Sequence, residues 1–143
     1  MAIEITSTSG FLILLLIVIT LTLPYTLRRQ MRAAGMQVST VWQRMKTHYW
    51  IGYAILALTL LHMYVSMGSG MLRRTNTLGI DLAVLGLLMI FAQVALGMNL
   101  ERAGGRRRRS LRKLHFALML GIVSVILLHV ALNGILLQAL IHG

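Results

Sequence analysis

The sequence predicts an all-α integral membrane protein whose four hydrophobic helices form an up-down-up-down bundle. Three observations support this fold class: the composition, four long apolar segments, and the placement of basic residues between them. The 143-residue chain is 57% hydrophobic and has only three acidic residues, a composition typical of membrane proteins. Because the sequence shows no alternating pattern of a membrane-spanning strand, its spanning backbone is expected to be helical.

The four apolar segments are predicted to form a single domain that includes the whole chain. The expected spans are about residues 10–28, 42–67, 78–100 and 111–141, and a helix needs ~20 residues to cross a bilayer. The first segment lacks the basic region of a secretory signal and is expected to be retained as a span. Since the connections are short, neighbouring helices are antiparallel, and the second and fourth helices are parallel and diagonal.

Basic residues are concentrated in the first and third connections. The second connection contains only Arg73 and Arg74. The positive-inside rule therefore predicts cytoplasmic first and third connections and outer (periplasmic) termini, a pattern that suits a prokaryotic plasma membrane. The net charge of +11 is interpreted as topology and contact with membrane lipid, and no nucleic-acid binding is expected.

The chain contains no cysteine. This excludes disulfides, thiolate-bound metals, iron–sulfur clusters and covalent c-type haem. A metal cofactor would therefore depend on His, Met or oxygen ligands.

Four of the five histidines form two matched sets. His48 and His62 lie fourteen residues apart in the second span, and His115 and His129 have the same spacing in the fourth. Fourteen residues are about 40° short of four helical turns and rise about 21 Å, so both histidines of a helix share one face. Because the two helices are parallel, His48 shares the inner depth with His115. His62 shares the outer depth with His129.

Each histidine pair can provide the two axial ligands of one haem iron. The pattern therefore predicts two non-covalent b-type haems between the diagonal second and fourth helices, where bundles commonly hold cofactors. Ionisable residues inside membranes are rare and usually functional. Zinc is disfavoured because neither depth offers a Cys or carboxylate partner. His142 has no partner at its depth and is interpreted as a surface residue.

Residues near the histidines are candidates for haem contacts, each with a structural alternative. Gly52 and Gly121 would let a flat macrocycle approach, or would serve ordinary helix packing. Ser66 and Asn133 can bond the outer propionates or be interfacial polar residues. The cationic candidates for the inner propionates are Arg44, Lys46, Arg112 and Lys113. These cations can form charge-assisted bonds, or can serve topology alone.

Two polar residues of the third span, Asp81 and Gln93, can be explained without a haem contact. Asp81 suits the positive N-terminal end of a helix, with proton uptake at a quinone site as its functional alternative. Gln93 is interpreted as a buried hydrogen-bonding residue.

The segments RMKTHYWIGYAILALTLLHMYVSM and LRKLHFALMLGIVSVILLHVALN resemble the haem-bearing helices of membrane di-haem b-type cytochromes. The likeness extends over about residues 42–135 and is nearest to ferric-reductase-like transmembrane domains and small four-helix bacterial b cytochromes. The haem-bearing half of respiratory cytochrome b is similarly arranged. The resemblance implies electron transfer between two haems, with these axial ligands: His48, His62, His115 and His129.

The sequence shows neither the flavin or nucleotide domain of larger ferric reductases nor the second half of respiratory cytochrome b. The chain is therefore expected to be an electron-transfer subunit of a larger redox complex, or a homo-oligomer, working with other redox subunits or electron carriers. One alternative is a stand-alone oxidoreductase that oxidises quinol or reduces metal, possible only with a quinone or substrate site. Another is a haem-free transporter in which the histidines relay protons or metal ions.

Overall fold

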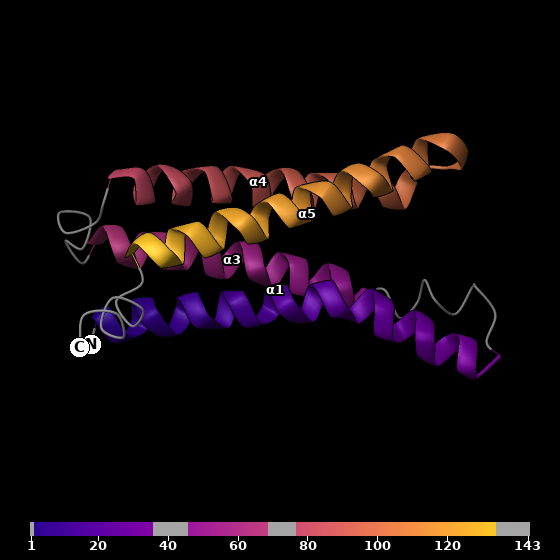
Figure 1. Cartoon of the computed structure of the whole chain (residues 1–143), viewed down its shortest axis with the longest axis horizontal. Helices are drawn as coiled ribbons and strands as arrows, with labels where there is room; N and C mark the ends of the chain where they lie inside the picture. Colours follow the sequence, from indigo (N-terminus) through magenta and orange to yellow (C-terminus); the bar gives the residue numbers. More distant parts are fainter. Residues whose placement is uncertain (1, 36–45, 69–76, 134–143) are drawn as a thin grey trace.

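The computed structural model describes residues 2–35, 46–68 and 77–133, and this part of the chain forms four α-helices (Figure 1). The helices are α1 (Ala2–Ala33), α3 (Lys46–Gly68), α4 (Thr77–Arg102) and α5 (Gly105–Asn133). The predicted all-α class is confirmed. Each helix is long and apolar enough to cross a membrane, which supports the prediction of a multi-pass membrane protein.

Several helix ends extend beyond the predicted spans. α1 reaches from Ala2 to Ala33, and α5 begins at Gly105, inside the arginine-rich segment. The predicted spans follow the apolar segments, whereas helical hydrogen bonding continues into the polar residues beyond them. Gly105 has a φ of 54°, a left-handed conformation that favours glycine at the tight turn after α4. Residues 42–45 and 134–141 of the predicted spans lie outside the described residues.

The helices pack as two antiparallel hairpins. α1 packs against α3, α4 packs against α5, and the hairpins meet mainly where α3 contacts α4. Figure 1 shows the four helices running roughly along one axis, with the end of α1 diverging from the others. In the described part of the chain, α3 and α5 are not a closely packed pair, as expected for diagonal helices.

Three buried glycines of α4 lie at its contact with α5: Gly79, Gly86 and Gly97. A Cβ atom built on each of them would face a side chain of α5, in order Asn133, Val125 and His115. Only the Cβ atom on Gly79 would clash, whereas the other two would be in ordinary van der Waals contact. Gly79 therefore allows a close approach of α4 to the end of α5.

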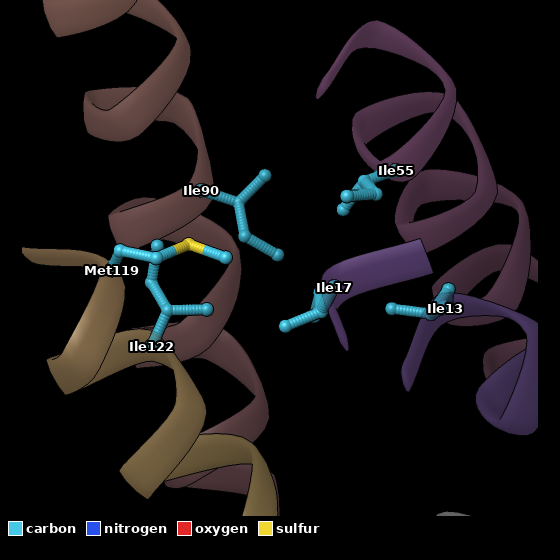
Figure 2. Close-up of a cluster of buried hydrophobic side chains, with 6 residues drawn as sticks. All are labelled: Ile13, Ile17, Ile55, Ile90, Met119 and Ile122. Atoms are coloured by element: carbon cyan, nitrogen blue, oxygen red, sulfur yellow. The ribbon is translucent and has the colours of Figure 1, made fainter. Parts of the chain in front are cut away.

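The buried core lies between the two hairpins. Ile13, Ile17 and Ile55 project from α1 and α3 toward a second group from α4 and α5, made of Ile90, Met119 and Ile122 (Figure 2). Large apolar side chains cover the outside, and Leu88 and Phe116 are 61% and 60% exposed. An apolar exterior of this kind is suited to lipid and unsuited to water.

Candidate cofactor site

A cavity occupies one end of the bundle. Its volume is about 660 Å³, within the usual range of ~300–1,000 Å³ for small-molecule and cofactor sites. All four helices contribute to its lining, which is mostly apolar. Four cations also line it: Arg28, Arg108, Arg112 and Lys113. We call this end the basic end, and the other end, which contains His62 and His129, the opposite end.

His48 of α3 and His115 of α5 face each other beside this cavity. Their ring centres are 6.2 Å apart, and the ring planes are inclined by 63°. Two imidazoles that ligate one metal ion from opposite sides have ring centres roughly 6 Å apart, because each metal–nitrogen bond is about 2 Å long. The structure thus brings together two histidines from different hairpins in an edge contact, while His115 Nε2 itself lies 3.2 Å from Gln93 Nε2.

Three cavity residues carry buried polar atoms that lack a hydrogen-bond partner within the described residues. These atoms are His48 Nδ1, His115 Nδ1 and Gln93 Oε1. Buried polar atoms in folded proteins are almost always hydrogen-bonded. These atoms lie around one cavity whose lining reaches the core residues Ile55 and Ile122, and a bound group or ordered water would satisfy them.

Gly52 and Gly121, the two glycines predicted to let a macrocycle approach, have different surroundings. Gly52 lines the cavity, and a Cβ atom there would meet nothing within 4 Å, so a flat ligand can approach α3 at this point. A Cβ atom on Gly121 would lie 2.7 Å from Met89 Cε of α4. Gly121 is not among the residues that line the cavity. Its position favours the helix-packing interpretation over contact with a macrocycle at the basic end.

The predicted cations are only partly placed at the cavity. Arg112 and Lys113 line it, whereas Lys46 is exposed and is not among its lining residues. Arg44 lies outside the described residues.

Sequence reasoning assigned two further cavity cations, Arg28 and Arg108, to topology or lipid contact. Arg108 precedes Arg112 by four residues, so the shared helix face was available as a signal. Arg28 lies on α1, and its contribution depends on how α1 packs, which no local pattern reveals.

At the opposite end, each histidine is hydrogen-bonded through Nδ1. His62 Nδ1 lies 2.9 Å from Ser9 Oγ on α1. His129 Nδ1 lies 2.8 Å from the carbonyl oxygen of Gly79 on α4. A carbonyl oxygen only accepts, so His129 Nδ1 donates its proton and the lone pair of a neutral ring is on Nε2. Metal-ligating histidines commonly donate in this way, which fixes the tautomer and orients the ring.

Ser66 and Asn133, the two residues predicted near the outer haem, also lie at this end. Ser66 is half-buried, one helical turn beyond His62 on α3. Asn133, at the end of α5, packs against Gly79. Both positions are compatible with either of their predicted roles.

Sequence reasoning missed the partners that α1 and α4 provide to the histidines. Besides Ser9 and the Gly79 carbonyl, Gly10 packs against the His62 ring, where a Cβ atom would lie in ordinary contact, 3.5 Å from His62 Cε1. One signal was present on α4. Gly79 and Gln93 are fourteen residues apart, the same spacing as the two α5 histidines that they contact.

Comparisons of the chain with profiles of protein families, with curated sequences and with solved structures find no significant match.

Proposed function

We propose that this protein transfers electrons across the membrane through two bis-histidine b-type haems. The observation that carries the proposal is the facing pair of His48 and His115, with ring centres 6.2 Å apart, beside a cavity of about 660 Å³. A metal site made only of protein side chains usually needs three or four ligands. The described residues contain no group of three or more His, Cys, Asp or Glu that could hold a metal ion. A haem iron needs only two ligands from the protein, because the macrocycle provides the other four.

The cavity residues suit haem in their chemistry. His48 and His115 are the proposed axial ligands at the basic end, and Gly52 provides space for the macrocycle beside α3. The propionates of haem are anionic, and the cations nearest to them would be Arg112 and Lys113, with Arg28 and Arg108 at the same cavity. The mostly apolar lining favours retention of a non-covalent cofactor.

The second haem is proposed at the opposite end, with His62 and His129 as axial ligands. The hydrogen bonds of their Nδ1 atoms to Ser9 and Gly79 orient both rings. His48 and His62 are fourteen residues apart on one helix, so the two sites are separated by about 21 Å along α3. Ser66 and Asn133 are candidates to bond the propionates at this end.

When bound, the haems provide one-electron redox chemistry, and the protein determines how they are held and insulated. Apolar side chains such as Ile55 and Ile122 separate the two ends. The positive-inside rule favours a cytoplasmic basic end. Each electron that crosses would then work with or against the membrane potential, at ~2.3 kcal/mol per charge for each 100 mV.

We also propose that the chain works as a cytochrome b subunit with other redox subunits or electron carriers. The proposed role of the four histidines is to hold haems that carry electrons. The donor and acceptor of the electrons would then be partners at the two membrane faces.

The test is a reduced-minus-oxidised optical spectrum of the purified protein, with haem quantified per polypeptide. Two low-spin b-type haems per chain are expected. Absence of haem after expression with ample haem would overturn the proposal and favour a histidine relay for protons or metal ions. Turnover of quinol or metal ions by the isolated haem-loaded chain would instead identify a stand-alone oxidoreductase.

A further inference from the structure

Gln93 contacts the nitrogen of His115 that a haem iron would need. Its side-chain Nε2 lies 3.2 Å from His115 Nε2, across the packed interface of α4 and α5. A carboxamide NH₂ group can only donate, so His115 Nε2 accepts this hydrogen bond and the proton of the neutral ring is on Nδ1. His115 Nδ1 is buried and has no hydrogen-bond partner within the described residues.

His129 provides a matched comparison inside the same pair of helices. His115 and His129 are fourteen residues apart on α5, and each is bonded to an α4 residue, Gln93 or Gly79, at the same spacing. At the opposite end, His129 Nδ1 bonds to the backbone carbonyl of Gly79, and this bond does not involve His129 Nε2. At the basic end, the bond to Gln93 involves His115 Nε2. Equivalent positions on α4 therefore restrain the two rings through different nitrogens.

We infer that Gln93 is a positioning residue of the basic-end site that competes with haem iron for His115 Nε2. This inference rests on the proposed function. In the haem-free protein the Gln93 amide holds the ring through Nε2, and iron can bind only after that hydrogen bond is broken. The opposite-end ligand His129 has no such competing contact from Gly79, because the Gly79 bond is compatible with ligation.

The consequence is a lowered affinity of the basic end for haem, because the contact from Gln93 to His115 Nε2 must be broken before that nitrogen can become a ligand. A neutral hydrogen bond of this kind corresponds to roughly a two- to tenfold factor in an equilibrium constant.

The test uses Gln93→Leu in a full-length chain that also carries His129→Ala, so that haem titration reports the basic end alone. Leucine removes the competing donor while keeping a similar side-chain size. We expect the apparent affinity for haem to rise roughly two- to tenfold.

Asn99→Leu is the matched control. Asn99 is an exposed carboxamide on α4 whose Nδ2 bonds only within its own helix, to the carbonyl oxygen of Ala95. The same change of residue type there should leave haem affinity unchanged. Equal affinities of the Gln93→Leu and Asn99→Leu proteins would overturn the competition while leaving the proposed function intact.

A second readout needs no haem. Nitrogen-15 NMR of histidine-labelled, haem-free protein should show His115 protonated on Nδ1, and its Nε2 resonance should move downfield in Gln93→Leu. A proton on Nε2 in the unsubstituted protein would contradict the inference. Failure of every variant to bind haem would overturn the proposed function and, with it, the competition.

Discussion

The two ends of the bundle carry the same histidine spacing in different surroundings. At the basic end, His48 and His115 face each other beside a cavity lined by four cations, and both Nδ1 atoms lack a hydrogen-bond partner within the described residues. At the opposite end, His62 and His129 are each bonded through Nδ1 to a neighbouring helix. The difference comes from α1 and α4, which carry no histidine.

This comparison shows that ligand spacing and ligand environment are separate properties of the chain. The histidine spacing is the same on α3 and α5, but the residues that contact the histidines differ. On α4, glycine contacts His129 and glutamine contacts His115. Because hydrogen bonds to a ligand tune its orientation and basicity, the two proposed haems would differ in affinity and in potential. The substitutions below test whether the ends are as independent as the geometry suggests.

The largest effect is expected from removing one ligand at each end. His115→Ala should lose the basic-end haem, and His129→Ala should lose the opposite-end haem, so that each variant retains half of the haem per chain. The reason is that an alanine cannot replace an axial ligand. Pyridine haemochrome analysis of the purified variants measures this directly. His142→Ala serves as the control and should retain both haems, and a His115→Ala protein with full haem content would refute the pairing.

Smaller, site-specific effects are expected from substituting two glycines, Gly52 and Gly121, that lie in different surroundings. Gly52→Leu fills the basic-end cavity, where a Cβ atom meets nothing within 4 Å. It should therefore lower haem content while leaving the unfolding of the haem-free protein nearly unchanged. Gly121→Leu presses on Met89 of α4 and should destabilise the haem-free protein by about 1–3 kcal/mol.

Haem content and unfolding in detergent distinguish these two glycine variants. If Gly52→Leu retains the basic-end haem, the cavity is not the haem site. If Gly121→Leu selectively loses haem without loss of stability, Gly121 belongs to a haem site after all.

The smallest effect is expected from the hydrogen bond at the opposite end. Ser9→Ala removes the partner of His62 Nδ1, and a neutral hydrogen bond contributes about 0.5–1.5 kcal/mol. Haem affinity at this end, measured in a His115→Ala background, should fall roughly two- to tenfold. Ser124→Ala is the control, because Ser124 Oγ bonds only to Leu120 in its own helix. An equal response of both serine variants would show that Ser9 does not support the ligand.

The fold class was predictable because membrane helices have strong and local signals. Apolar segments long enough to span a bilayer follow from composition alone, and all four are helical in the described residues. Helix ends were less predictable, since α1 and α5 extend into polar flanks that hydropathy does not include. The pairing of His48 with His115 followed from helix direction and spacing, which need no side-chain detail.

The sequence by itself determined the four apolar helices, the two matched histidine spacings and the concentration of basic residues at one end. Only the tertiary structure decided which residues surround each histidine. Ser9, Gly79 and Gln93 reach the imidazoles through the packing of α1 on α3 and of α4 on α5. The physical reason is that periodicity fixes the face of a helix, whereas the contacts across an interface depend on the register between two helices. At Gly79, for example, a Cβ atom would clash with Asn133 of α5, so glycine is suited to this register.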